Sequence, residues 1–202
     1  EVKKNYAVPR KTEIKDEITE IKVDLKDMIP KEDVIVVVTN DGYIKKVPMK
    51  SFKAATDETT LKPGDFVRNM FELNTRDYIL SFTSLGNYLF IPVHTITECK
   101  WKDLGKHISN IIPLMDDEKI VHSMFVSDFD EEKYITSFSK NGMIKRTLLN
   151  EFKAQRYSKP IKMMNLKDDD EIVNVTDSSD REVFVATSCG YGLWYDVSEV
   201  PV

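Results

Sequence analysis

The amino-acid sequence predicts an all-β protein built from a repeated hairpin unit. Short runs rich in strand-forming residues come in pairs, and a turn containing glycine joins each pair. The pairs occupy residues 33–52, 77–96, 133–152 and 182–200. A period of about 50 residues is typical of a radial or stacked β-repeat such as a propeller. The alternative is one irregular β-sandwich with coincidental hairpins.

The turn glycines define a common register. Asp41-Gly42 and Asn141-Gly142 supply the positive φ that tight hairpin turns require. In each unit a threonine or serine lies three residues before the glycine, and an apolar residue lies ten residues after it. In chain order the glycines are Gly42, Gly86, Gly142 and Gly190, the hydroxyl residues Thr39, Thr83, Ser139 and Thr187, and the apolar residues Phe52, Ile96, Phe152 and Val200. This register favours a true repeat.

Each unit is predicted to continue beyond its hairpin. Apolar runs at residues 66–73, 119–126 and 171–178 are consistent with a third and a fourth strand. The predicted units are 33–76, 77–132, 133–182 and 183–202. The last unit holds only one hairpin, and because two strands alone are marginal, we expect a strand from elsewhere or a longer natural domain. Residues 1–32 do not fit the repeat and are predicted to be a linker, with a strand or a short helix over 12–21 left open.

Composition excludes several classes of protein. Of 202 residues, 41% are hydrophobic and 31% charged, which indicates a folded, water-soluble chain. No apolar run approaches the roughly 20 residues of a membrane span, and no signal peptide is visible. Cys99 and Cys189 form neither a disulfide framework nor a metal-spaced cluster, which suits a reducing cytosol.

No catalytic or metal-binding motif is found. His94, His107 and His122 lack the close spacing of a metal site, and the chain contains no P-loop, no GxGxxG after a strand and no GxSxG. The acidic clusters at 116–118 and 168–171 lack the spacing of a calcium loop, so we interpret them as solvated turns. We therefore expect no active site, metal or cofactor in this chain.

The charge is unevenly distributed between the units, so the net charge of the chain alone is a poor guide to its partner. A net charge of −5 argues at first against a nucleic-acid partner. However, residues 77–132 carry a net −6, whereas residues 33–76 carry +1 and residues 133–182 carry +2. The first and third units can therefore still present a basic surface.

Basic residues recur at one position of the repeat. Lys45-Lys46 and Lys145-Arg146 lie three and four residues after their glycines, and the loop 152–162 contains basic residues but no acidic one. Neighbours in a strand point to opposite faces, so one member of each pair should face outwards. Such residues could follow a phosphate backbone; the alternative is an ordinary solvated surface. The candidate contacts are Lys45, Lys46, Lys50, Lys53, Lys145, Arg146, Lys153, Arg156, Lys159 and Lys162.

Six stretches in fixed order carry a family resemblance. They are residues 10–14 (RKTEI), 32–46 (EDVIVVVTNDGYIKK), 82–94 (FTSLGNYLFIPVH), 100–109 (KWKDLGKHIS), 138–146 (FSKNGMIKR) and 152–160 (FKAQRYSKP). They resemble the C-terminal domain of the A subunit of bacterial type IIA topoisomerases. Within that family they look like the topoisomerase IV (ParC) branch of Gram-positive type.

The resemblance implies a β-pinwheel, in which four-stranded blades exchange strands with their neighbours. It implies an outer rim that binds and bends double-stranded DNA for ATP-dependent strand passage, and thus decatenation, relaxation and chromosome segregation, by the whole enzyme. The catalytic tyrosine, Mg²⁺ and ATP would then be used elsewhere, and the fragment itself would be non-catalytic. Further implied partners are a second A subunit and a ParE-type ATPase subunit, in the cytoplasm and at the nucleoid.

One departure from the family matters. Gyrase A carries a Gln-Arg-Arg-Gly-Gly-Lys-Gly box after its first hairpin, whereas residues 52–60 here read FKAATDETT. The missing box favours decatenation and relaxation over DNA wrapping with negative supercoiling. The alternatives are a gyrase A wrapping domain or a protein-interaction β-propeller that docks through its acidic second unit.

Overall fold

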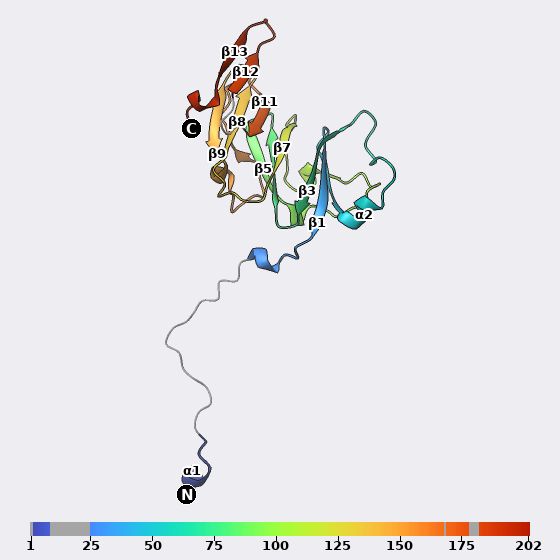
Figure 1. The fold of residues 1–202 in the computed structure, drawn as a ribbon, viewed down its shortest axis with the longest axis vertical. Helices are drawn as coiled ribbons and strands as arrows, with labels where there is room; N and C mark the ends of the chain where they lie inside the picture. The colour runs from blue at the N-terminus through green and yellow to red at the C-terminus, as the bar shows by residue number, and fades with distance from the viewer. Residues whose placement is uncertain (1, 9–24, 168, 178–181) are drawn as a thin grey trace.

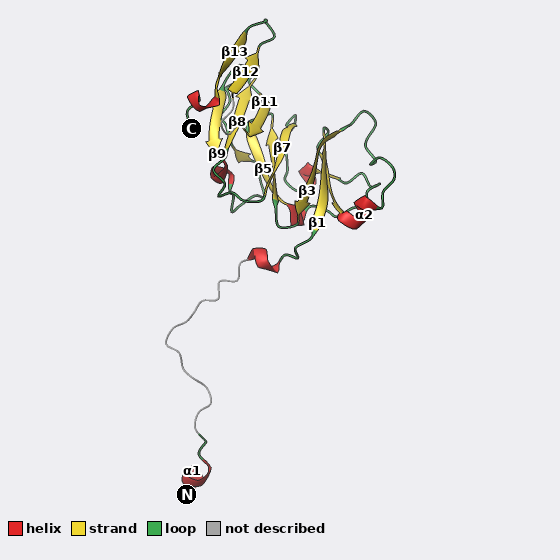
Figure 2. Cartoon of the chain, viewed as in Figure 1, coloured by secondary structure: helices red, strands yellow, loops and turns green. Residues whose placement is uncertain are grey.

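The computed structural model describes residues 2–8, 25–167, 169–177 and 182–202. Strands dominate these residues, and the helices are all short (Figure 2). The all-β prediction is therefore confirmed, while the strand or helix considered for 12–21 lies outside the described residues. The α-helices are α1 (Val2–Tyr6) and α2 (Met49–Lys53); the 3₁₀ helices are η1 (Leu25–Met28), η2 (Val93–Thr95), η3 (Ile108–Asn110), η4 (Leu149–Phe152) and η5 (Val197–Glu199).

Each predicted hairpin forms an antiparallel pair at the core of its own sheet. The first sheet has the order β3-β1-β2-β6, the second β10-β5-β4-β7, the third β11-β8-β9 and the fourth β12-β13. Their strands are β1 (Asp33–Thr39), β2 (Tyr43–Pro48), β3 (Val67–Asn74), β4 (Tyr78–Thr83), β5 (Asn87–Pro92), β6 (Lys106–His107), β7 (Ile120–Val126), β8 (Tyr134–Ser139), β9 (Ile144–Leu148), β10 (Ile161–Lys162), β11 (Ile172–Asp177), β12 (Glu182–Ala186) and β13 (Gly192–Asp196). We call these sheets blades one to four.

The first two blades receive a strand from the following unit. Strand β6 belongs in sequence to unit two but pairs with β2 of blade one, and β10 of unit three pairs with β5 of blade two. Strand exchange, which the resemblance implied, is thus present. We call the segments that carry these strands, residues 97–107 and 152–162, the crossing segments.

Apolar layers between neighbouring blades hold the repeat together. One core joins Val36 and Ile44 of blade one to Ile79 and Leu89 of blade two. A second core lies between blades two and three. Because blade two is covered on both sides, every residue of β5 is buried, as expected for a strand between two layers. Figure 1 shows the blades side by side, with β12 and β13 at the far end from β1.

The apolar residue ten positions after each turn glycine anchors the short helix that follows the hairpin. Ile96, Phe152 and Val200 are buried, and Phe52 packs edge-on against Trp101 at a centroid distance of 4.9 Å. The predicted register therefore marks four equivalent core positions. It also explains why each hairpin is followed by a helical turn, which aims this side chain back at the sheet.

One carboxylate in each acidic cluster departs from the solvated turn that the sequence suggested, while Asp116, Asp117, Asp169 and Glu171 are exposed as predicted. Glu118 accepts hydrogen bonds from the side chains of Thr83 (2.5 Å) and Asn87 (2.7 Å), and it is buried. Asp170 is also buried and accepts from the Ser139 hydroxyl (2.7 Å) and from the Asn141 amide (2.9 Å). Each carboxylate ties a hairpin turn to the loop that precedes the third strand of its blade, so it is needed inside.

Blade one repeats this arrangement with a different acid. The Asp65 carboxylate accepts from the backbone amides of Asp41 and Phe66, at 3.0 and 2.8 Å. The residue before each of the three acids has positive φ, and these residues are Gly64, Asp117 and Asp169. The left-handed residue turns the chain so that the following carboxylate reaches the hairpin, and in two blades an aspartate accepts that strain.

The described residues contain no helix that is long and apolar enough to cross a membrane.

Candidate functional site

The outer edge of the blades is formed by the crossing segments. Strands β3, β7 and β11 are edge strands on one side of their sheets, and β7 lies against both of the others. These three strands therefore face the centre of the array. The opposite sheet edges, β6 and β10, face outwards, so the crossing segments form a rim on blades one and two.

Lys45 does not reach this rim. Its side chain is only 2% exposed, and its ammonium group donates to the carbonyl oxygens of Trp101 (2.8 Å) and Asp103 and to the Thr59 hydroxyl. Burial lowers the pKa of Lys45. Lys45 thus holds the first crossing segment on the sheet, and its predicted availability to DNA is wrong because three oxygens already occupy its donors.

Lys46 is also buried, so the expected alternation fails in β2. Its backbone bonds to Thr97 and Cys99 of the crossing segment, and its side chain lies on the face opposite to that of Lys45. Both faces of β2 are covered, one by the crossing segment and the other by blade two. The sequence could not show this double cover, because the covering residues lie some 50 positions away.

In β9 the alternation holds. Lys145 is exposed and donates to the carbonyl of Met163 (2.6 Å), whereas Arg146 is 8% exposed and stacks on Tyr134, 3.8 Å from the ring centroid. Among the described residues β9 is the last strand of its sheet, paired with β8 on one side and with no strand on the other. Of these two candidates, only Lys145 lies at the surface.

The other six candidates are exposed. Lys50 and Lys53 lie on α2, and Lys153, Arg156, Lys159 and Lys162 lie on the second crossing segment. Lys162 also donates to the carbonyl of Leu85 (3.0 Å). The described part of the chain places no acidic side chain in ion-pair contact with any of the six.

The sequence reasoning missed basic residues on the first crossing segment. Lys100 and Lys106 are exposed there, and Lys102 is exposed but paired with Asp57 at 2.6 Å. This segment is equivalent to residues 152–162, since β6 and β10 occupy the same place in their blades. Aligning the two crossing segments with each other, and not only the hairpins, could have identified them.

Comparison with known proteins agrees with this architecture. The family described as "DNA gyrase C-terminal domain, beta-propeller" matches residues 33–56, 77–127, 133–177 and 181–202. The chain is 43% identical over 203 residues to the A subunit of DNA topoisomerase 4 from Bacillus subtilis, and 42% identical over 202 residues to that from Staphylococcus epidermidis. These matches cover 100% and 99% of this chain, which spans 25% of each relative's length.

Solved structures place the fold in the same family. A crystal structure of the C-terminal domain of DNA topoisomerase IV superposes with a TM-score of 0.82 at 45% identity, covering 86% of this chain and 55% of the other. The Escherichia coli ParC C-terminal domain superposes with a TM-score of 0.68 at 16% identity, covering 84% and 67%, and shares the fold. The chain therefore belongs to the family of DNA gyrase C-terminal β-propeller domains.

Proposed function

We propose that this chain is a DNA-binding domain from the A subunit of a topoisomerase IV, and that duplex DNA lies along its outer rim. The proposal rests on the family and on one observation of geometry: the two crossing segments present their lysines and arginine at equivalent outer edges of adjacent blades. Contacts of this kind are made to phosphates, so binding should be independent of base sequence and sensitive to salt.

The rim is uneven, and this determines the mode of binding. The second crossing segment offers four basic side chains and no acidic one, whereas the first also carries Glu98 and Asp103. A duplex held at both segments passes around the outside of blades one and two and has to follow their curvature. Bending of the duplex is thus part of the proposal, and affinity should come mainly from blade two.

The activity of the whole protein is a further proposal, since the chain covers a quarter of the length of its relatives. We propose that the rim presents a DNA segment for strand passage by an enzyme that includes a second A subunit and a ParE-type ATPase subunit. Mg²⁺ and ATP would be used outside this chain. The absence of a Gln-Arg-Arg-Gly-Gly-Lys-Gly box favours decatenation and relaxation.

A salt titration tests DNA binding directly. A fluorescent duplex of about 35 base pairs is titrated with the chain over a series of salt concentrations, because the slope of log K against log salt is roughly −0.9 for each phosphate neutralised. The proposal requires a clear negative slope and equal affinity for two unrelated duplex sequences. Salt-independent binding, or none at low salt, would refute it.

A further inference from the structure

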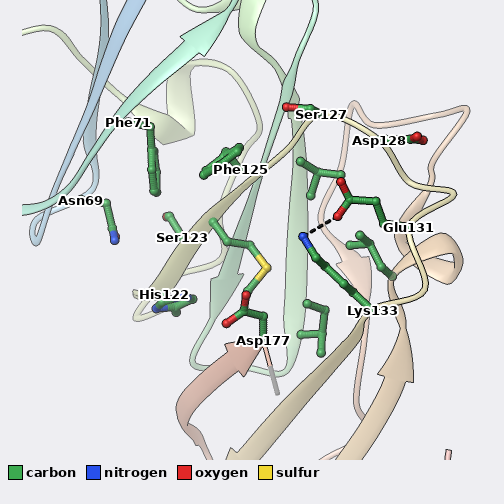
Figure 3. Close-up of a pocket in the computed structure, with 14 residues that line it drawn as sticks. Asn69, Phe71, His122, Ser123, Phe125, Ser127, Asp128, Glu131, Lys133 and Asp177 are labelled. Carbon is green, nitrogen blue, oxygen red and sulfur yellow. Dashed lines mark ion pairs between the residues drawn. The ribbon is translucent and has the colours of Figure 1, made fainter. Parts of the chain in front are cut away.

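A cavity of about 270 Å³ lies on the central side of the array, away from the rim. It is open between β3 and β7, the loop 127–133 and the end of β11 (Figure 3). Small-molecule sites usually have volumes of roughly 300–1,000 Å³. This cavity lies at the lower end of that range and is large enough to receive one long side chain.

Aromatic rings form one wall of the cavity. Phe71 of β3 and Phe125 of β7 lie with their centroids 5.8 Å apart, and Phe125 is 51% exposed although it lies within a strand. In Figure 3 both rings border the same side of the cavity, above Ser123 and His122. Ring faces attract cations electrostatically and also cover the aliphatic stem of a long basic side chain.

The polar groups in the cavity are predominantly acceptors. Among the described residues of the lining, Asp128, Glu131 and Asp177 contribute three carboxylates, and Lys133, ion-paired with Glu131, contributes one ammonium. The Oδ1 atom of Asn69 is buried and has no hydrogen-bond partner among the described residues. The lining thus has an excess of negative charge and an acceptor that lacks a donor.

His122 does not offset this charge. Burial lowers its pKa, the nearby Arg68 lowers it further, and Asp177 opposes the shift. The imidazole is therefore neutral at pH 7, and the cavity keeps its net negative charge.

We propose that this cavity is a docking site for a lysine or arginine side chain in a basic segment of a protein partner. Carboxylates would accept from the cationic head, while Phe71 and Phe125 would cover its stem. Asp130 and Glu132, which are exposed in the adjoining loop, continue the negative surface beyond the cavity. A stretch of several basic residues therefore fits better than a single small cation, and DNA is repelled.

Fluorescence anisotropy tests this with a defined probe, the fluorescein-labelled peptide Gly-Lys-Arg-Leu-Lys-Arg-Gly. The chain should bind it saturably, and Phe125→Ala and Asp177→Asn should each weaken binding by about fivefold or more. Asp116→Asn is the matched control, because it removes the same charge from an exposed residue of another loop. It should change affinity by less than about twofold, as expected for a distant screened charge.

Each remaining outcome decides the proposal. Equal effects of Asp116→Asn and Asp177→Asn would show unspecific attraction and overturn it, as would an unchanged affinity for Phe125→Ala. Displacement of the peptide by spermidine at equal concentration would identify a free polyamine as the ligand instead. Duplex affinity of the same variants is measured in parallel and should not change, so a failure of this site is distinguishable from a failure of the rim.

Discussion

The ammonium group of Lys45 donates to the carbonyl oxygen of Trp101 at 2.8 Å, across 56 positions of sequence. The same ammonium lies 5.5 Å from the centre of the Trp101 ring. Trp101 in turn donates from its indole nitrogen to the carbonyl of Asp57 (2.7 Å) and packs on Phe52. One buried lysine thus connects the hairpin of blade one to the crossing segment that completes it.

Lys45→Met should destabilise the fold without weakening DNA binding. The substitution leaves the carbonyls of Trp101 and Asp103 without their charged donor, which costs about 1–3 kcal/mol of unfolding free energy. Lys153→Met is the matched control on the exposed crossing segment, where the change in stability should stay within about 0.5 kcal/mol. Urea unfolding measures both. A stable Lys45→Met variant with reduced DNA affinity would place Lys45 on the binding surface after all.

Gly105→Ala should detach the first crossing segment from blade one. Gly105 has φ +86°, and an added Cβ would lie 2.7 Å from the Ile44 carbonyl oxygen and 2.9 Å from the Lys45 Cβ. We expect the unfolding free energy of Gly105→Ala to be lower by more than about 3 kcal/mol. The backbone amide of Ile108 donates to the carbonyl oxygen of Gly42 at 2.8 Å. Its hydrogen should exchange faster in this variant, because the first crossing segment is detached.

Gly142→Ala separates backbone strain from this close approach. Gly142 has φ +85° but nothing within 4 Å of its added Cβ. The unfolding free energy of Gly142→Ala should therefore fall only by the cost of the left-handed conformation, about 1–2 kcal/mol. Equal losses for the two glycine variants would mean that the close approach at Gly105 does not matter.

Asp170→Asn should reduce the sensitivity of the fold to acid. Although burial raises the pKa of Asp170, hydrogen bonds from Ser139 and from two backbone amides outweigh it and hold this pKa below the ordinary value of 3.8. A lowered pKa in the folded state contributes stability above the ordinary value, and this stability is lost as the pH falls through the folded pKa. The unfolding free energy of Asp170→Asn should thus fall less steeply below about pH 4.

Ser139→Ala tests the role of the Asp170 carboxylate in a second way. It removes one donor, so the pKa of Asp170 should rise towards its ordinary value and the acid-dependent loss of stability should again become smaller. Urea titrations between pH 2.5 and 7 (roughly the range spanned by the carboxylates) follow both variants. If the unfolding free energy of both variants depends on pH as steeply as that of the unsubstituted chain, Asp170 does not contribute to acid unfolding.

Neutralising the second crossing segment should weaken DNA binding and reduce its salt dependence. Glutamine at Lys153, Arg156 and Lys159 removes three exposed charges, so the magnitude of the salt slope should fall by about 0.9 for each phosphate that is no longer neutralised. The matched control is glutamine at Lys119, Lys140 and Lys167, which are exposed but lie off the crossing segments. A larger effect of the control set would move the DNA path away from the rim.

The local sequence pattern was sufficient to predict the hairpins but not the strands at the sheet edges. The turn at Gly42 follows from residues close together in the chain, because a tight turn is a local property. The core position of Phe152 follows from the offset of ten residues that is repeated after each turn glycine. The resemblance implied only that strands are exchanged between blades, and no pattern identified β6 as the strand that completes blade one. A two-residue strand at Lys106 has no periodicity to read, and it pairs only where β2 already provides an edge.

The sequence by itself determined the all-β class, the four repeated hairpins, the core register and the family. Only the tertiary structure decided which charges are available: it buried Lys45, Lys46 and Arg146, exposed the lysines of the crossing segments, and turned Glu118 and Asp170 inwards as ties between loops. The reason is that burial depends on what covers a strand, and the covering segment comes from the next unit of the repeat. Charge along the chain therefore could not define the binding surface.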